Sequence, residues 1–374
     1  MAMARILHTE SSMGWGGQEM RILAEARGMI GRGHQVTVAC RPGSGIAQNA
    51  PLYAVPTISA SLGGPGDLRG ILQIAGYCRA LGIEIVSTHS SGDSWCAGMG
   101  GRLAGRKVIR TRHLSIAVKK GLSSRFLYGS IPHFVVTTGQ ALADRLVEDG
   151  LVDGRCAFSI PTGIDCSRFL ADVRVRQQVR AEFGLEAGPV VVGVLAMVRQ
   201  MKGHRVLVEA SGEILKACPQ VRFLLVGDAP TGNPVKREIE DLAQAMGVKE
   251  SFIFAGYRED THRMLNAMDI LALPSIRDEG VPQSISQAMA TSLPVVATRV
   301  GAVAEQVLEG KTGILVNPGD GPGLAEAIIK LVGDAGLRDA FGQEGRIRAE
   351  QVFSLDAMLD STEELVARLL AGRH

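Results

Sequence analysis

Short apolar runs alternate with longer amphipathic segments along most of this chain. The first run covers residues 5–8, and an amphipathic segment follows it at 18–32. Such alternation is typical of βα units, in which strands form a parallel sheet beneath helices. With 374 residues, the chain is too long for one ordinary hydrophobic core. The pattern therefore predicts an α/β protein with two doubly wound domains.

The predicted strands fall into two sets. The first set comprises 5–8, 35–39, 84–87, 107–110, 134–137 and 157–160. The second comprises 190–195, 222–226, 251–255, 270–273, 294–297 and 313–316, with helices at 204–216, 235–246 and 282–290 among them. The polar stretch 166–190 lies between the sets and is the expected junction. Two doubly wound sheets without a long linker indicate a ligand held between facing strand ends.

Cysteine usage and hydropathy bear on the compartment. The six cysteines show neither a C-x-x-C pair nor a zinc-ligand spacing, so we expect reduced thiols. The chain starts with a strand-like segment instead of the apolar stretch of a signal peptide. Its longest apolar run, 189–198, has about half of the ~20 residues that a membrane helix needs. We therefore expect a cytoplasmic protein without a membrane-spanning helix.

One long stretch of the first half is strongly basic, although the net charge of the whole chain is only +2. Between Ser94 and Ala143 there is no Asp or Glu, but there are eight Lys and Arg residues. This stretch predicts a positive surface, suited to phosphates or to an anionic membrane face. The alternative, a basic helix and loop that contact only solvent, stays open.

The segment from 270 to 290 carries the strongest chemical pattern. A buried strand ends in a loop with Glu279, and a helix opens behind it with Pro282 in its first turn. The backbone N–H groups of Gln283 and Ser284 would point at an anion, which the helix dipole would also attract. Glu279 would accept hydrogen bonds from hydroxyl groups. Alternatively, Glu279 is an ordinary acid at a helix N-terminus.

A second cluster follows the strand at 190–195. Arg199 and Lys202 come after this strand and before the next helix. Two cations at the carboxyl end of a strand can neutralise the charge that grows on a departing diphosphate. We expect them to meet Glu279 around one pyrophosphate. The alternative is a solvated loop.

Five segments, in this order, resemble the retaining glycosyltransferases of family four, which have the GT-B fold. They are Gly16 with Gly17, 160–165 with Phe169, 199–203, 225–228, and 254–256 continuing through 273–275 to Glu279. The resemblance covers nearly the whole chain. It implies two Rossmann-like domains across a cleft: an acceptor domain over 1–170, completed by the helix at 355–374, and a donor domain over 171–354.

The resemblance implies roles for residues of the second half. Arg199 and Lys202 would bind the donor diphosphate, and Glu279 would contact the hydroxyls of the transferred sugar. Phosphate ligands would come from Gln283 and Ser284. Tyr257 and Arg258 would border the nucleobase. The family usually has a glutamate on the ribose where this chain has Gln287, and an amide loses the charge-assisted bond.

Residues of the first half also match the family. His113 would meet the donor sugar or its phosphate, and Gly16 and Gly17 would lie in the loop that closes over donor or acceptor. His89 follows a predicted strand and could face the acceptor. Asp93 could do the same, or it could cap the helix that follows.

The resemblance implies transfer of a hexose with retention, from a nucleotide-diphosphate sugar that we expect to be a UDP-sugar. We expect no metal and no other cofactor. The implied acceptor is an envelope glycolipid or polysaccharide, as in lipopolysaccharide biosynthesis, with an anionic membrane surface at the inner face as a further partner and no nucleic acid. Two alternatives stay open: a sugar-nucleotide epimerase or hydrolase, and a non-catalytic sugar-nucleotide-binding protein, which would explain Gln287.

Overall fold

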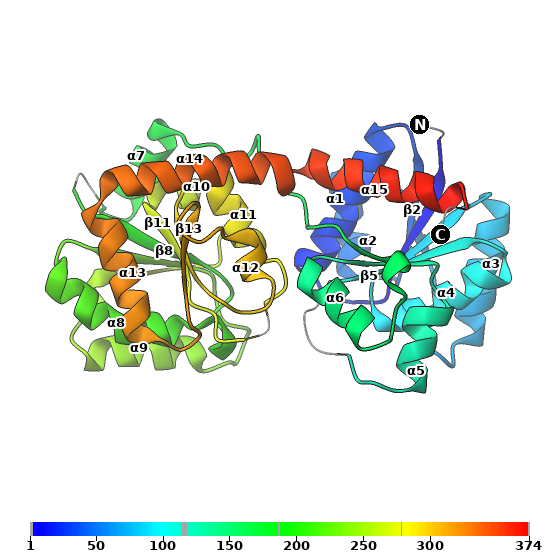
Figure 1. Ribbon diagram of the computed structural model, residues 1–374, viewed down its shortest axis with the longest axis horizontal. Helices are drawn as coiled ribbons and strands as arrows, with labels where there is room; N and C mark the ends of the chain where they lie inside the picture. The colour runs from blue at the N-terminus through cyan, green and yellow to red at the C-terminus, as the bar shows by residue number, and fades with distance from the viewer. Residues whose placement is uncertain (1–2, 114–117, 186–187, 278, 373–374) are drawn as a thin grey trace. The chain divides into compact units, whose positions relative to one another are not determined.

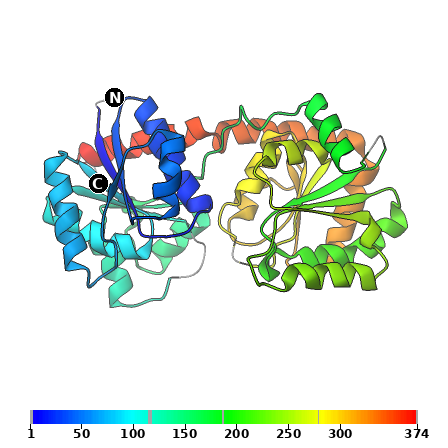
Figure 2. The same cartoon turned by 180° about the vertical axis from the view of Figure 1, so that it is seen from behind.

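A computed structural model describes residues 3–113, 118–185, 188–277 and 279–372. The chain divides into two compact units. Unit 1 is Met1–Gly163 together with Leu355–His374, and unit 2 is Ile164–Ser354 (Figure 1). Each unit is a parallel sheet with helices on both faces, which Figure 2 shows from the other side. Both predicted sheets are therefore present.

Unit 1 has a seven-stranded parallel sheet in the order β3-β2-β1-β4-β5-β6-β7. Its strands are β1 (Arg5–Glu10), β2 (Gln35–Cys40), β3 (Thr57–Ser59), β4 (Ile85–Thr88), β5 (Lys107–Arg112), β6 (Phe134–Thr137) and β7 (Ala157–Ser159). The sequence did not predict β3, since this short edge strand has a single apolar residue, Ile58, which is only half-buried.

The helices of unit 1 cover three hydrophobic clusters. They are α1 (Gly17–Gly31), α2 (Gly45–Asn49), α3 (Leu68–Ala80), α4 (Ser91–Leu103), α5 (Leu122–Arg125), α6 (Gln140–Glu148) and α15 (Leu355–Leu370). Alternation along β1 separates two of these clusters, because Ile6 packs with α1 and α15 whereas Leu7 packs with α3 and α4. The C-terminal helix α15 thus completes the core of unit 1.

Unit 2 has a six-stranded parallel sheet in the order β10-β9-β8-β11-β12-β13. Its strands are β8 (Val191–Leu195), β9 (Arg222–Val226), β10 (Phe252–Gly256), β11 (Ile270–Leu273), β12 (Val295–Thr298) and β13 (Gly313–Val316). Its helices are α7 (Val173–Glu182), α8 (His204–Ala217), α9 (Val235–Ala245), α10 (Thr261–Ala267), α11 (Gln283–Ala290), α12 (Val303–Gln306), α13 (Gly321–Gly333) and α14 (Ala335–Val352).

The stretch 166–190, predicted as a polar junction, belongs to unit 2. It contains α7, of which only Val179 is fully covered. Arg176 and Arg180 of this helix both bind Asp269, at 2.5 and 2.6 Å. Ion pairs with a residue that is distant in the sequence therefore hold α7 in unit 2. Local hydropathy does not predict such contacts.

The chain crosses between the units at Gly163 and Ile164, which is earlier than the predicted boundary at residue 170. Ile164 and Phe169 pack into a core of unit 2, and this packing explains the earlier crossing. The second crossing lies between Ser354 and Leu355, where the predicted helix at 355–374 begins. Among the described residues, no helix has both the length and the hydropathy required to cross a membrane.

Candidate active site

The sheet of unit 2 reverses its strand order between β8 and β11, and two predicted site residues meet there. Lys202 ends the short 3₁₀ turn η4 (Gln200–Lys202) after β8, and Glu279 follows β11. The carboxyl ends of neighbouring parallel strands form a crevice at such a reversal, and ligands of doubly wound folds bind in it. The Lys202 Nζ lies 2.6 Å from Oε1 of Glu279.

Two glycines allow this contact. Gly203 has φ +71°, and a Cβ atom there would lie 1.7 Å from the carbonyl oxygen of Pro274. Gly301 has φ +53°, and a Cβ atom there would lie 1.7 Å from the carbonyl oxygen of Glu279. Only glycine combines a left-handed backbone with so close an approach. The loops that carry Lys202 and Glu279 therefore pack against neighbouring backbone without a side chain between them.

Glu279 is held in place but keeps one oxygen open. Glu279 is only 4% exposed. The hydroxyl of Ser275 donates to its Oε1 at 2.5 Å, and Lys202 Nζ contacts the same oxygen. Within the described part of the chain, no hydrogen bond uses Oε2. A fixed carboxylate with one free oxygen can accept hydrogen bonds from hydroxyl groups of a ligand.

Helix α11 begins directly behind Glu279, with Gln283 and Ser284 in its first turn. Gln306 fixes this end, because its Nε2 donates to the Pro282 carbonyl oxygen at 3.2 Å and to Ser286 Oγ at 2.9 Å. The first turn presents the positive end of the helix dipole to the crevice. Gln287 is half-buried and lies one turn beyond Gln283, on the same face of the helix.

Arg199 lies on the same loop as Lys202 but does not contact Glu279. Its side chain is exposed, and it makes no ion pair or hydrogen bond with the residues that the structure describes. The prediction that Arg199 joins Lys202 at a diphosphate stays a prediction, and its guanidinium has no carboxylate partner in the described chain to compete with an anion.

Tyr257 and Arg258 follow the edge strand β10, which is separated from β8 by β9. Tyr257 is 69% exposed. Arg258 binds Asp260 at 2.8 Å and Glu182 of α7 at 2.6 Å. These hydrogen bonds raise the pKa of Arg258 above its ordinary value. Arg258 thus ties α7 to the end of β10, and this geometry favours Tyr257 over Arg258 as the predicted neighbour of a nucleobase.

In unit 1 the strand order reverses between β1 and β4, and the predicted glycine-rich loop follows β1. Gly16 is the N-cap of α1, and Gly17 is its first residue. This loop rests on the start of α2, because Gly45 N donates to the Met13 carbonyl oxygen at 3.2 Å. A Cβ atom on Gly45 would lie 2.2 Å from the Gly14 carbonyl oxygen.

Three histidines form a line at the same reversal. His8 Nδ1 lies 2.9 Å from His89 Nε2, and His89 Nδ1 lies 3.0 Å from His113 Nε2. Burial holds the pKa of all three imidazoles below the ordinary value, furthest for His89 and His113. His89 is only 3% exposed. This geometry does not favour the predicted contact between His89 and an acceptor, whereas His113 is partly exposed at the end of the line.

Two buried carboxylates lie beside this line. Glu10 is fully buried at the end of β1 and accepts hydrogen bonds from Ser12 N, from Ser90 Oγ and from the amide of Gln18. Asp93 forms a capping box with Ser90 at the start of α4, so the structure shows the cap that was one of its two predicted roles. Burial, and next the charge of Glu10, raise the pKa of Asp93 to about 8.

His8 and Glu10 were not predicted as site residues. The available signal was that His8 and Glu10 follow the apolar pair Ile6 and Leu7 in a predicted central strand, where a histidine or a glutamate is seldom fully buried without a partner. Among the described residues, no three His, Cys, Asp or Glu side chains gather in an arrangement that could hold a metal ion.

The basic stretch is less exposed than its composition predicts. Residues 114–117 of it lie outside the described residues. Arg110 is 3% exposed, lies 4.2 Å from the ring centre of Tyr128 and donates to its hydroxyl at 3.2 Å. Lys120 pairs with Asp149 at 2.8 Å. Arg110 therefore does not contribute to the predicted positive surface, because β5 lies inside the sheet.

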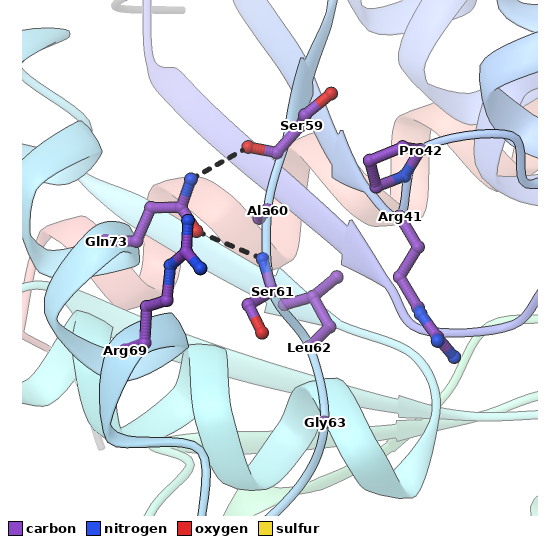
Figure 3. Close-up of a pocket in the computed structure, with 9 residues that line it drawn as sticks. All are labelled: Arg41, Pro42, Ser59, Ala60, Ser61, Leu62, Gly63, Arg69 and Gln73. Atoms are coloured by element: carbon purple, nitrogen blue, oxygen red, sulfur yellow. Dashed lines mark hydrogen bonds between the residues drawn. The ribbon is translucent and has the colours of Figure 1, made fainter.

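A pocket of about 570 Å³ opens at the carboxyl ends of β2 and β3 (Figure 3). Gln73 closes one side, since its amide accepts from Ser61 N at 3.0 Å and donates to the Ser59 carbonyl oxygen at 3.1 Å. Arg41 and Arg69 line the pocket from opposite sides, and both are exposed. Neither guanidinium bonds to another residue of the described chain, so the pocket presents two available cations.

Two family models match the chain. The model described as Glycosyltransferase Family 4 matches residues 15–168, and the model described as Glycosyl transferases group 1 matches residues 188–334. The first match lies in unit 1 apart from its last residues, and the second lies wholly in unit 2.

Glycosyltransferases of other organisms are similar to this chain over half of its length or more. The D-inositol 3-phosphate glycosyltransferase of Corynebacterium jeikeium is 28% identical over 81% of this chain and 77% of its own length. The UDP-Gal:alpha-D-GlcNAc-diphosphoundecaprenol alpha-1,3-galactosyltransferase of Escherichia coli is 22% identical over 86% and 84%. A GDP-mannose-dependent phosphatidylinositol monomannoside mannosyltransferase of Mycolicibacterium smegmatis is 32% identical over 50% of each chain.

Solved structures share the fold of the chain. Anabaena HepE in complex with UDP aligns with a TM-score of 0.88 at 20% identity, over 97% of this chain and 99% of that one. A glycosyltransferase from Rickettsia africae aligns with a TM-score of 0.90 at 21% identity, over 99% of each. The fold is thus GT-B, and the chain belongs to the glycosyltransferases, with a family 4 domain in its first half and a group 1 domain in its second.

Proposed function

We propose that this glycosyltransferase moves a hexose with retention of configuration from a UDP-sugar to a phosphate-bearing glycolipid of the cell envelope. The contact between Lys202 and Glu279, at the strand reversal of unit 2 and ahead of α11, carries the donor half of this proposal. The cation and the helix N-terminus match the diphosphate of a nucleotide-sugar, and the hydroxyl acceptor matches its sugar.

Each of these groups has one task in the proposed reaction. Lys202 and Arg199 neutralise the charge that grows on the departing diphosphate, and the first turn of α11 shares this task. Glu279 receives sugar hydroxyls on its free oxygen. Gln287, one turn into α11, contacts the ribose through an amide. Tyr257 stacks beside the base. The protein supplies alignment and charge stabilisation, and no side chain is needed as a nucleophile.

The relatives support a phosphate-bearing acceptor, because the names of the three described above each contain a phosphate group on the acceptor side: inositol 3-phosphate, phosphatidylinositol mannoside and diphosphoundecaprenol. Unit 1 offers a matching site. In the pocket of Figure 3, Arg41 and Arg69 present available cations, and Leu62 and Ala60 give it an apolar wall. Guanidinium groups are well suited to bind phosphate.

A lipid-linked acceptor implies work at the inner face of the membrane, so we propose a cytoplasmic protein that binds the membrane peripherally. Leu68 and Leu72 support this, because they are 71% and 64% exposed and lie one turn apart on α3, on either side of Arg69. Exposed apolar side chains beside a cation are typical of surfaces that contact anionic lipid.

The test is a transfer assay with a panel of nucleotide-sugars, with and without lipid-phosphate acceptors in anionic vesicles, and with EDTA. We expect sugar transfer from a UDP-sugar only when acceptor is present, at the same rate after chelation, and vesicle binding that weakens as salt is added. Conversion of the donor without acceptor would indicate an epimerase or hydrolase, and binding without turnover would indicate a non-catalytic protein. Either result would refute the proposal.

A further inference from the structure

The line of His8, His89 and His113 is built from three neighbouring strands of unit 1. His8 lies within β1, while His89 follows β4 and His113 follows β5. Their ring centres are separated by 5.2 Å at both steps. Both nitrogens of the central imidazole are used, one by His8 and one by His113. The line therefore contains two nitrogen–nitrogen contacts, and each needs one proton.

Counting protons leaves two arrangements. A neutral imidazole has one N–H and one bare nitrogen, so His89 must donate to one neighbour and accept from the other. If His89 donates from Nδ1, then His8 donates from its own Nδ1, and His113 carries its proton on Nδ1. If His89 donates from Nε2, then His113 donates from Nε2, and its Nδ1 is bare. The two arrangements give the Nδ1 of His113 opposite roles.

We propose that His8 and His89 are positioning residues that fix the tautomer of His113, and so decide whether its Nδ1 donates a hydrogen bond to the sugar-nucleotide or accepts one from it. Among the described residues, no hydrogen bond uses this nitrogen. The choice of ligand rests on the proposed function. The coupling of the three tautomers does not, because it follows from the contacts within unit 1.

The charges around the line help to keep it neutral. Arg21 of α1 opposes protonation of all three histidines, and Glu25 of the same helix favours it at His8 alone. Arg21 lies 3.6 Å from Glu25, so the cation is partly balanced by its own neighbour. Since burial is the larger influence on each ring, a doubly protonated His89 is disfavoured, and His89 keeps its single proton.

The experiment is nitrogen-15 NMR of the full chain labelled at histidine, with each ring nitrogen assigned as protonated or bare at neutral pH. We expect one fixed tautomer for His89 and one for His113, with both rings protonated on Nδ1 or both on Nε2. Rings that differ in their protonated nitrogen, rapid averaging between tautomers, or a doubly protonated His89 would overturn the proposal. No substrate is needed, so this result is independent of the transfer assay.

A variant pair tests the coupling. In His8→Phe the His89 Nε2 loses its nearer partner and keeps only the Ser87 hydroxyl at 3.5 Å, which can either donate or accept. We therefore expect His89 and His113 to lose their fixed tautomer. The matched control is His204→Phe, because His204 is also 2% exposed and neither of its ring nitrogens has a partner within the described residues. The control should leave both signals unchanged. If folded His8→Phe keeps the wild-type tautomer of His113, the line of histidines does not fix that tautomer, and the proposal is overturned. Should His8→Phe fail to fold, the wild-type spectrum decides.

Discussion

A Cβ atom on Gly203 would lie 1.7 Å from the carbonyl oxygen of Pro274, so the backbone after Lys202 rests directly on the backbone that leads to Glu279. Ile276 N donates to the Met201 carbonyl oxygen at 2.8 Å across the same junction. The two loops are therefore joined by main-chain contacts, which hold Lys202 near Glu279 in addition to the attraction between the two side chains.

We predict that Gly203→Ala destabilises the protein by about 2–4 kcal/mol, since alanine meets both the left-handed φ and the clash with Pro274. Chemical denaturation measures the change in the free energy of unfolding. Gly212→Ala is the control: this position lies in α8, where a Cβ would only touch Met246 Cε at 3.7 Å. The control should be neutral or stabilising by up to about 1 kcal/mol. Equal effects at the two positions would contradict the packing argument.

Lys202→Ala should lower kcat/KM for the donor at least about tenfold, because the departing diphosphate loses a cation. Steady-state kinetics with the donor found in the transfer assay measure the change. Arg205→Ala serves as the control, since Arg205 is exposed on α8 and pairs with Glu209 one turn away at 2.8 Å. A Lys202 variant that keeps wild-type kcat/KM would remove this residue from the mechanism.

Gln287→Glu should tighten donor binding, because a carboxylate on α11 would make a charge-assisted bond to the ribose. The gain is on the order of 1 kcal/mol, which corresponds to a roughly fivefold lower KM for the donor. Gln287→Ala should raise this KM instead. Both variants need comparison in the same assay at one ionic strength. If Gln287→Glu binds the donor more weakly, the residue faces a phosphate and not the ribose.

The pocket on unit 1 predicts an effect on the acceptor alone. Arg69→Ala should raise the KM for a phosphate-bearing acceptor about tenfold and leave the KM for the donor unchanged, since one charge-assisted phosphate contact contributes about 1.5 kcal/mol. Arg79→Ala is the matched control, because Arg79 lies on the last turn of the same helix and its guanidinium reaches the Leu103 carbonyl oxygen at 3.5 Å. Equal changes in both variants would place the acceptor elsewhere.

Elements with strong local signals could be predicted from the sequence. The strands β6 and β11 have the predicted bounds, because each is a short apolar run between polar segments. The contact between Lys202 and Glu279 was also expected, since strand ends of a doubly wound sheet converge. Long-range polar contacts could not be predicted. The contact of His8 with His89 joins residues 81 positions apart, and only the strand order brings them together.

The buried pair of Glu10 and Asp93 predicts a dependence of stability on pH. Burial raises the pKa of Asp93 in the folded protein to about 8, from its ordinary value of 3.8. The contribution of Asp93 to the free energy of unfolding is therefore fully present below pH 3.8 and is lost as the pH rises toward 8. The charge of Glu10 is the second cause of this shift, after burial.

Glu10→Gln should therefore reduce the loss of stability between pH 5 and pH 8. Its amide oxygen can still accept from Ser12 N, and Gln18 can turn its own amide to face the new one. We expect the difference in Tm, variant minus wild type, to increase steadily as the pH rises. Glu84→Gln is the control, because Glu84 accepts from Arg5 N at 3.0 Å before β4 begins. Its Tm difference should stay constant. A constant difference for Glu10→Gln as well would mean that the two buried carboxylates do not interact.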